Sequence, residues 1–417
     1  MNKITRVIVL GHVDVSKSTF ISVMKNNVLD DGRGSARNMI MKLRHERETG
    51  RTTNVTFNTF RIKERLVSLI DLAGHEKYFG NTLSGITNTF PNYAILLIGA
   101  NKGVTKITRD HFTILMYLKM PTIILITKMD MTPESEYKKT VEEVKTLIMK
   151  FKQFKRVLYG IKNEEEYKKY VELGLIEKMN TVIPMINISN KTGHNLEIIK
   201  DIIGELCKSE RKEKFNEVRG FEEKRDSIFY IDNNYMVRGV GLIFSGLLRG
   251  KDIELSKNEK YYIGPINGTF MQIKIKSIHN YEKESIGKLE NNENGCVSVS
   301  FIKDKIQINR KKLKRGIIIV NSENYEKYLT MRFKANIYVF THATSIKENY
   351  QSVIHCNNLK KPAKIIEIRE KSCLRSNDKG EVIMEFLSEP GYIELGSLFF
   401  FREGLTKGIG KVVELIS

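Results

Sequence analysis

Cysteine is scarce in this chain, and long apolar runs are absent. The 417 residues contain four cysteines, none of them in a C-x-x-C pair, which argues against a zinc ribbon or a disulfide framework and indicates a reducing compartment. No stretch approaches the roughly 20 apolar residues that cross a bilayer, and the amino-terminal apolar run is too short for a signal peptide. Low-complexity segments and solenoid-type repeats are absent as well. We therefore expect a cytoplasmic protein without membrane contact.

The chain is long and strongly basic. Because domains usually comprise roughly 100–150 residues, its length predicts two or three of them. The formal net charge of +20 is spread along the whole sequence, and a surface of this kind attracts polyanions. Nucleic acid is the partner that the charge favours, and a basic composition without any polyanion partner is the alternative.

The first half of the chain alternates short apolar runs with helical stretches. The first run is β-branched, ends at Gly11 and leads into a helical pattern. Further apolar runs occupy residues 66–70, 93–98, 122–126 and 182–188. Fully apolar strands that alternate with helices are typical of a doubly wound, mostly parallel α/β sheet that is covered on both faces. We assign this domain to residues 1–208.

The second half has a different character. Residues 209–226 are charged and poor in apolar side chains, which predicts a linker. After them, short strands separated by turns with Gly and Asn replace helical periodicity almost completely. This pattern predicts two small β-barrels, which we assign to residues 227–322 and 323–417.

The stretch GHVDVSKST, residues 11–19, predicts a phosphate-binding loop between the first strand and the first helix. In the pattern G-x-x-x-x-G-K-[ST], backbone N–H groups and the helix N-terminus face the phosphates. Lys17 is expected to reach the β- and γ-oxygens and the Ser18 hydroxyl to bind Mg²⁺. The other predicted nucleotide contacts here are Asp14, Val15, Ser16 and Thr19. Ser16 replaces the loop glycine, so it predicts either crowding of the phosphate or a strained backbone.

A second motif, DLAGH, follows the apolar run that ends at Ile70. Asp71 can hold Mg²⁺ through water, and the N–H of Gly74 can bond the γ-phosphate. The segment RHERETGRTTNV between the two motifs is polar and has no apolar face, as is typical of a nucleotide-dependent switch. Within it, Thr52 is the predicted second Mg²⁺ hydroxyl, and Thr53 is the alternative.

Two further motifs predict a guanine site. In TKMD, Asp130 can accept hydrogen bonds from guanine N1 and N2, Lys128 can lie along the ring, and Thr127 takes the first position of the motif. The stretch ISNK places Ser189 and Asn190 for backbone contact with guanine O6. Taken alone, DLAGH could equally be an ordinary turn, TKMD an exposed charge pair and ISNKTG a helix cap. All of them in this order, each at the carboxyl end of a predicted strand, are specific for a GTP-binding domain.

With GHVD, DLAGHEKY, TKMD and a β-rich second half, the chain resembles the translational GTPases of the elongation factor Tu and elongation factor 1-alpha superfamily. The stretches LDDGRGSARNMI, ETGRTTNV and FREGLTKGIGKV are similar to the branch of GTP-binding proteins one and two. The resemblance covers nearly the whole chain. It implies a G domain with two β-barrels, and GTP hydrolysis that the ribosome stimulates while an aminoacyl-tRNA is bound or released.

The resemblance also implies cofactors and residue roles. GTP or GDP and Mg²⁺ are the expected ligands. The histidine that matches His75 positions the attacking water in this family. The aspartate that matches Asp14 holds a monovalent cation beside the phosphates, and a helix-capping Asp14 is the alternative. Two residues depart from the family pattern. Thr127 stands where the family usually has asparagine, and Arg51 stands where the elongation factors have an apolar gate residue.

The expected partners are the ribosome and aminoacyl-tRNA or another RNA, bound by a monomer. The resemblance implies that the barrels bind them through surfaces around residues 238–241 and 360–364. Two basic clusters, residues 149–156 and 310–316, are further candidates for phosphate contacts, and a solvated face is the alternative for each. Two rival functions remain at this point: a ribosome-rescue or RNA-surveillance GTPase with a protein partner, and a GTP-binding scaffold that does not hydrolyse.

Overall fold

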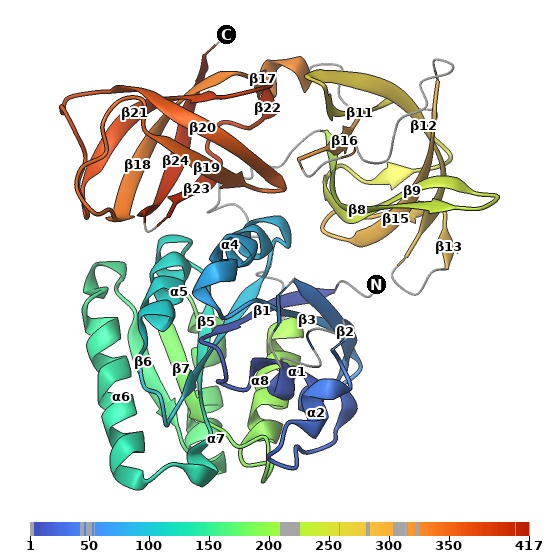
Figure 1. Ribbon diagram of the computed structural model, residues 1–417. Coiled ribbons are helices and arrows are strands. Elements are labelled where there is room, and N and C mark those ends of the chain that lie inside the picture. Colours follow the sequence, from blue (N-terminus) through green and yellow to red (C-terminus); the bar gives the residue numbers. More distant parts are fainter. Residues whose placement is uncertain are drawn as a thin grey trace. The chain divides into compact units, whose positions relative to one another are not determined.

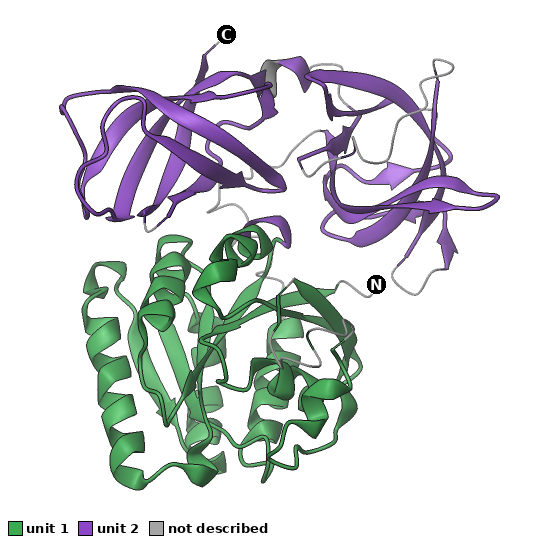
Figure 2. Cartoon of the chain, viewed as in Figure 1, with its two compact units in different colours: residues 1–86, 90–212 green, residues 87–89, 213–417 purple. Residues whose placement is uncertain are grey.

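The structure is a computed structural model, and it divides into two compact units (Figure 2). One unit contains residues 1–86 and 90–212, and the other contains residues 87–89 and 213–417. The residues that the structure describes are 4–41, 46, 52–53, 55–208, 226–257, 259–280, 284–302, 313, 316–321, 325–404 and 406–416. Residues 209–225 of the predicted linker lie outside this description. The domain boundaries therefore stay a prediction.

A seven-stranded sheet forms the centre of the first unit (Figure 1). Its strands, in spatial order, are β2 (Thr56–Ile62), β3 (Arg65–Asp71), β1 (Thr5–Gly11), β4 (Tyr93–Gly99), β5 (Thr122–Thr127), β7 (Val182–Asn187) and β6 (Val157–Ile161). Strand β2 pairs antiparallel with β3, and every other neighbouring pair is parallel. The predicted mostly parallel sheet is thus confirmed.

Helices cover this sheet and explain why its central strands are apolar throughout. The helices are α1 (Lys17–Asn26), α2 (Ser35–Asn38), α4 (Phe79–Asn88), α5 (Lys106–Tyr117), α6 (Glu134–Met149), α7 (Glu164–Glu172) and α8 (Leu196–Lys208). Buried residues of α1, α7 and α8 share one core cluster with Val7 and Val9 of β1. Because side chains alternate along a strand, Ile8 and Leu10 point to the other face, where they are equally buried. In the described part of the chain, no helix is long and apolar enough to span a membrane.

The parallel strands bring the loops of all predicted motifs to one edge of the sheet. Val9 of β1 is in register with Asp71 at the end of β3, and Gly99 of β4 is in register with Thr127 at the end of β5. Because parallel strands all end at the same edge, the loops that follow them are neighbours. This edge is where ligands bind in open α/β sheets.

The second unit contains two closed six-stranded β-barrels, as predicted. The first has the strand order β11 (Tyr261–Ile266), β16 (Ile318–Val320), β8 (Ser227–Val237), β9 (Gly241–Gly250), β15 (Asn294–Phe301) and β12 (Thr269–His279), and the pairing of β11 with β12 closes it. The second has the order β18 (Arg332–Thr341), β21 (Lys379–Phe386), β20 (Leu359–Ile368), β19 (Gln351–Cys356), β23 (Leu398–Glu403) and β24 (Thr406–Ile416). The additional short strands are β10 (Ile253–Glu254), β13 (Ser285–Ile286), β14 (Lys288–Leu289), β17 (Leu329–Thr330) and β22 (Gly391–Tyr392).

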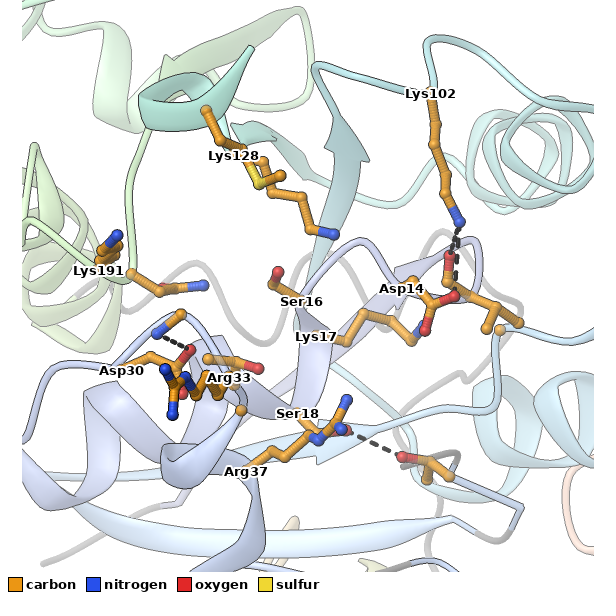
Figure 3. A pocket seen from close by; sticks show the side chains of 18 of the residues that line it. Asp14, Ser16, Lys17, Ser18, Asp30, Arg33, Arg37, Lys102, Lys128 and Lys191 are labelled. Atoms are coloured by element: carbon orange, nitrogen blue, oxygen red, sulfur yellow. Dashed lines mark hydrogen bonds and ion pairs between the residues drawn. The ribbon is translucent and has the colours of Figure 1, made fainter. Parts of the chain in front are cut away.

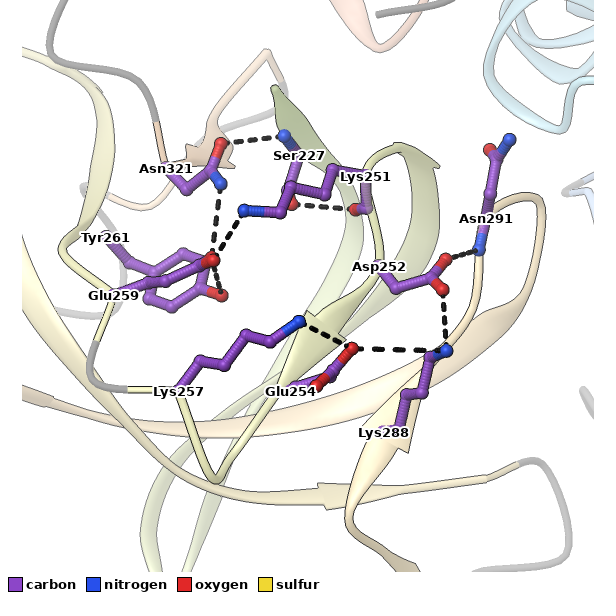
Figure 4. Close-up of polar contacts among 10 residues, drawn as sticks. All are labelled: Ser227, Lys251, Asp252, Glu254, Lys257, Glu259, Tyr261, Lys288, Asn291 and Asn321. Atoms are coloured by element: carbon purple, nitrogen blue, oxygen red, sulfur yellow. Dashed lines mark hydrogen bonds and ion pairs between the residues drawn. The ribbon is translucent and has the colours of Figure 1, made fainter. Parts of the chain in front are cut away.

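A polar side-chain network stabilises the first barrel, and close packing of glycines against phenylalanine rings is a feature of the second. In the first, Glu259 accepts hydrogen bonds from Lys251 (2.6 Å), the Tyr261 hydroxyl (3.1 Å) and Asn321 (3.2 Å), as Figure 4 shows. The Asn321 side chain in turn accepts from the backbone N–H of Ser227 at 2.7 Å, so the polar network joins the start of β8 to the residue after β16. In the second barrel, a side chain at either Gly408 or Gly410 would collide with a phenylalanine ring of β23.

Candidate functional site

A cavity of about 640 Å³ opens beside the loops that follow β1, β3, β5 and β7, and all the predicted motifs contribute to its lining (Figure 3). The predicted site residues that line it are Asp14, Ser16, Lys17, Ser18, Thr19, Thr52, Gly74, His75, Lys128, Asp130 and Asn190. The remaining four, Val15, Asp71, Thr127 and Ser189, are buried next to lining residues. Motifs that are far apart in the sequence therefore meet at one place.

The phosphate loop holds a buried ammonium group at this cavity. Lys17 is the first residue of α1, and its Nζ donates a hydrogen bond to the carbonyl oxygen of His12 at 2.8 Å. Burial lowers the pKa of Lys17, whereas the nearby carboxylates of Asp71 and Asp14 raise it. Gly74 passes so close that an added Cβ would collide with the Lys17 ammonium and the loop backbone. Only glycine fits at position 74 without a steric clash, because the DLAGH motif packs directly against the phosphate loop.

Ser16 has a left-handed backbone, with φ +67° and ψ +30°. This is the region that glycine enters freely and that costs other residues about 1–2 kcal/mol. The Ser16 side chain makes no capping hydrogen bond to α1 that would offset this cost. Of the two consequences predicted for the missing glycine, the structure therefore shows backbone strain.

Three side-chain oxygens meet at the predicted magnesium position. The Ser18 hydroxyl donates to Oδ2 of Asp71 at 2.6 Å, the Thr52 hydroxyl donates to the same oxygen at 3.0 Å, and the two hydroxyls are 2.9 Å apart. The other carboxylate oxygen of Asp71, Oδ1, is buried and has no hydrogen-bond partner among the described residues. Burial raises the pKa of Asp71, and Lys17 and the two hydroxyls lower it.

Thr53 lies apart from these oxygens. Its backbone N–H and its hydroxyl both donate to Oε1 of the buried Glu46, at 2.8 and 2.9 Å. The hydroxyls of these adjacent residues thus bind different carboxylates, Thr52 that of Asp71 and Thr53 that of Glu46. The geometry favours Thr52, the first choice of the two. Arg51, the departure noted at the gate position, lies outside the described residues.

The TKMD loop supplies two lining residues and one anchor. Lys128 has a left-handed backbone (φ +63°) and precedes the short 3₁₀ helix η2 (Met129–Met131), which contains Asp130. Burial lowers the pKa of Lys128, and the neighbouring Lys102 lowers it further. The Thr127 hydroxyl donates to the carbonyl oxygen of Val15 at 3.1 Å. The threonine side chain therefore connects the end of β5 to the loop that follows β1.

The ISNK motif contributes Asn190 and Lys191 to the cavity lining. The Ser189 hydroxyl oxygen accepts hydrogen bonds from the N–H groups of Lys191 (3.2 Å) and Thr192 (3.1 Å), so it holds the turn. The carbonyl oxygen of Asn190 accepts from the N–H of Asp30 at 2.9 Å. The buried Oδ1 of Asn190 has no hydrogen-bond partner among the described residues. It is thus an acceptor left available on a residue that lines the cavity.

His75 is exposed, lines the cavity and is the N-cap residue of the 3₁₀ helix η1 (Glu76–Tyr78). Its Nδ1 accepts a hydrogen bond from the N–H of Lys77 at 3.1 Å. In a neutral imidazole, a nitrogen that accepts a hydrogen bond is the unprotonated one. The proton of neutral His75 is therefore on Nε2.

Residues 2–214 match the family described as the elongation factor Tu GTP binding domain, which is about half of the 417 residues. The chain belongs to this family of translational GTPases. Among curated relatives, GTP-binding protein 1 of Xenopus laevis is 30% identical over 438 residues, and the alignment covers 99% of this chain but 63% of the relative. GTP-binding protein 2 of Mus musculus is 27% identical over 435 residues, with 98% and 69% covered.

A solved structure shares the fold. The GTPase-like domain of Ski7 from S. cerevisiae, bound to GTP, superposes with a TM-score of 0.69 at 13% sequence identity and covers 98% of this chain and 97% of that domain. The chain spans less than two thirds of the length of GTP-binding protein 1.

The cavity also includes residues beyond those predicted for the site. They are Val13, Asp30, Gly32, Arg33, Gly34, Arg37, Lys102, Met131 and Lys191. The segment with both arginines is held by its own aspartates, since Asp30 accepts from the N–H of Gly32 at 3.0 Å and Asp31 from that of Arg33 at 2.7 Å. The signal was available in LDDGRG, because Asp and Gly in this spacing are typical of ordered turns.

The basic surfaces that the sequence proposed for RNA are only partly accessible. Arg156 is buried and donates to the carbonyl oxygen of Met120 at 2.6 Å, and burial lowers its pKa to about 10. Lys361 donates to the carbonyl oxygen of Pro390 at 2.6 Å, and Lys364 pairs with Glu385 at 2.8 Å. By contrast, residues 238–240 are exposed at the tip of the β8–β9 hairpin. Of the cluster at 310–316, all but residues 313 and 316 lie outside the described residues.

Proposed function

We propose that this chain binds GTP in the cavity and hydrolyses it to GDP and inorganic phosphate. The observation that carries the proposal is the convergence of three groups in one cavity. The buried ammonium of Lys17 suits phosphate, the oxygens around Asp71 suit a metal ion, and Asp130 suits the base. The elongation factor Tu GTP binding domain in residues 2–214 supports the same ligand.

The oxygen cluster suits magnesium. Mg²⁺ prefers hard oxygen ligands and keeps several of its waters. The side chains that would hold it are Ser18 and Thr52 directly and Asp71 through water. The buried Oδ1 of Asp71, which has no hydrogen-bond partner among the described residues, has the capacity to accept a bond from such a water. When bound, the ion would neutralise negative charge on the β- and γ-phosphates.

Guanine specificity is assigned to Asp130. Its carboxylate can accept hydrogen bonds from both N1–H and the N2 amino group of guanine, and adenine does not offer this donor pair. Lys128 lies next to it in the lining and can cover one face of the ring. Thr127 contributes to guanine binding indirectly, because its hydroxyl donates a hydrogen bond to the carbonyl oxygen of Val15 in the phosphate loop.

His75 is assigned the orientation of the attacking water. With the proton on Nε2, neutral His75 donates a hydrogen bond through that nitrogen and has no second acceptor for the proton of the water. Its contribution is therefore positioning and electrostatic stabilisation, which dominate phosphoryl transfer. The exposed position of His75 makes its ring accessible to a partner that fixes it against the nucleotide.

We place this activity in a cycle on the ribosome that involves aminoacyl-tRNA, carried out by a cytoplasmic monomer. The family membership and the net charge of +20 support a partnership with RNA. The test is GTP hydrolysis by the purified chain, alone and with ribosomes, and with or without aminoacyl-tRNA. Stimulation by ribosomes is the expected result. GTP binding without any hydrolysis would favour a non-hydrolysing scaffold.

The β8–β9 hairpin favours one alternative, a surveillance factor with a protein partner. Around Arg238, its tip exposes Tyr235, Met236, Val237 and Val240 by 41–60%, and exposed apolar side chains of this kind mark protein-binding sites. Pull-down with the wild type, Met236→Ser and Arg238→Ala separates the two. Loss of tRNA in Arg238→Ala supports the elongation cycle, whereas loss of a bound protein in Met236→Ser supports surveillance.

A further inference from the structure

Lys102 brings a second ammonium group to the phosphate loop, and no predicted motif includes it. It follows β4 and lines the cavity. Its Nζ lies 3.5 Å from Oδ2 of Asp14 and donates to the carbonyl oxygen of Val13 at 3.3 Å. Lys17 donates to the carbonyl oxygen of His12, the preceding residue of the loop. Two consecutive carbonyl oxygens of the phosphate loop therefore accept hydrogen bonds from two different lysine side chains. Figure 3 shows the contacts of Lys102.

The backbone that carries Lys102 is well fixed. The N–H groups of Lys102 and Gly103 both donate to the carbonyl oxygen of Gly99 at 3.0 Å, so the chain turns tightly after β4. The next N–H, of Val104, donates to the carboxylate of Glu143 on α6 at 2.7 Å. A positive charge on such a platform needs little reorganisation during a reaction, which is the condition for effective electrostatic catalysis.

The ligands of this ammonium group are a carboxylate and a backbone carbonyl, which are the oxygen ligands that a small monovalent cation would use. Asp14 is the residue for which the family resemblance implies such a cation. We propose that the Lys102 ammonium supplies this charge from within the chain and stabilises the negative charge that develops during GTP hydrolysis. The inference rests on the proposed GTPase function.

The charge matters at a defined step. In hydrolysis, the bond from the γ-phosphorus to the β–γ bridging oxygen breaks and a bond to the water oxygen forms. GDP leaves with the bonding electron pair, and inorganic phosphate and one proton are released. Because negative charge moves toward the leaving group, a fixed cation beside the loop lowers the barrier more than it strengthens ground-state binding.

The test is single-turnover GTP hydrolysis with Lys102→Met, which removes the charge at similar side-chain length. We compare buffers with potassium, ammonium or the bulky tetramethylammonium ion. In tetramethylammonium, the variant should be slower than the wild type by about 10- to 100-fold, with GTP affinity changed by less than about threefold. Potassium or ammonium should restore most of its rate, and the wild type should be equally fast in all three buffers.

Two further variants complete the design. Lys102→Arg keeps the charge and should keep the rate. Lys106→Met is the matched control, because Lys106 pairs with Glu76 at 3.3 Å in an exposed position and does not line the cavity; its rate should equal that of the wild type.

Three results would overturn the inference. They are acceleration of the wild type by potassium, a rate of Lys102→Met equal to that of the wild type, and a loss that small cations leave unrestored. Absence of hydrolysis in the wild type would instead contradict the proposed function. The response of the wild type to potassium can be measured even if the Lys102→Met variant does not fold.

Discussion

Replacement of Ser16 by glycine should relieve strain in the phosphate loop. At φ +67° and ψ +30°, a residue with a side chain costs the folded state about 1–2 kcal/mol relative to glycine. Glycine in turn makes the unfolded chain more flexible, which costs folding roughly 0.5–1 kcal/mol. The difference predicts that Ser16→Gly raises the free energy of unfolding by about 0.5–1 kcal/mol.

The effect of Ser16→Gly on nucleotide affinity should be small. We predict that the loop keeps the left-handed backbone at Ser16 both with and without bound nucleotide. Strain that is present both before and after binding cancels from the dissociation constant, so Ser16→Gly should tighten GTP binding by less than about threefold. If only the bound loop had this backbone, the full 1–2 kcal/mol would tighten binding by roughly 5- to 30-fold. A small effect therefore indicates a preformed loop.

Calorimetric titration with GTP and Mg²⁺, together with denaturant unfolding, measures both quantities. Ser16→Ala is the matched control, because it removes the hydroxyl but keeps Cβ and hence the strain. If alanine stabilised the protein as much as glycine does, the hydroxyl and not the backbone would be responsible. A wild type that binds no GTP, next to a Ser16→Gly variant that does, would refute the reading of the site as functional.

Three further predictions address the base, the metal and the water. Asp130→Asn should weaken GTP binding and favour xanthosine triphosphate, whose 2-oxo group needs a donor; unchanged preference would remove Asp130 from the base site. Thr52→Ala should weaken Mg²⁺-dependent GTP binding about tenfold, the loss of one ligand, whereas the control Thr53→Ala should change it by less than about threefold; the reverse order would exchange their roles. His75→Ala should lower ribosome-stimulated single-turnover hydrolysis by about 10²-fold at unchanged GTP affinity, and equal rates would rule out its catalytic role.

The central strands and the motifs were readable in the sequence because their signals are local. Strands that are buried on both faces need an uninterrupted apolar run, so β1, β4, β5 and β7 were evident. Strands β2 and β6 escaped notice, since they lie at the two ends of the sheet and carry polar or half-exposed residues. Parallel strands end at a common edge, and for this reason motif order alone predicted that Lys17, Asp71 and Asp130 come together.

Tertiary structure decided what depends on contacts between distant segments. The choice between Thr52 and Thr53 needed the positions of Asp71 and Glu46, which neighbouring residues cannot reveal. The backbone of Ser16 also became known only in the folded loop. Lys102 belongs to no motif, and its pairing with Asp14 arises because β4 ends beside β1 in the sheet. The sequence by itself determined the fold class and the nucleotide motifs, and the packing of loops at the sheet edge determined which side chains meet there.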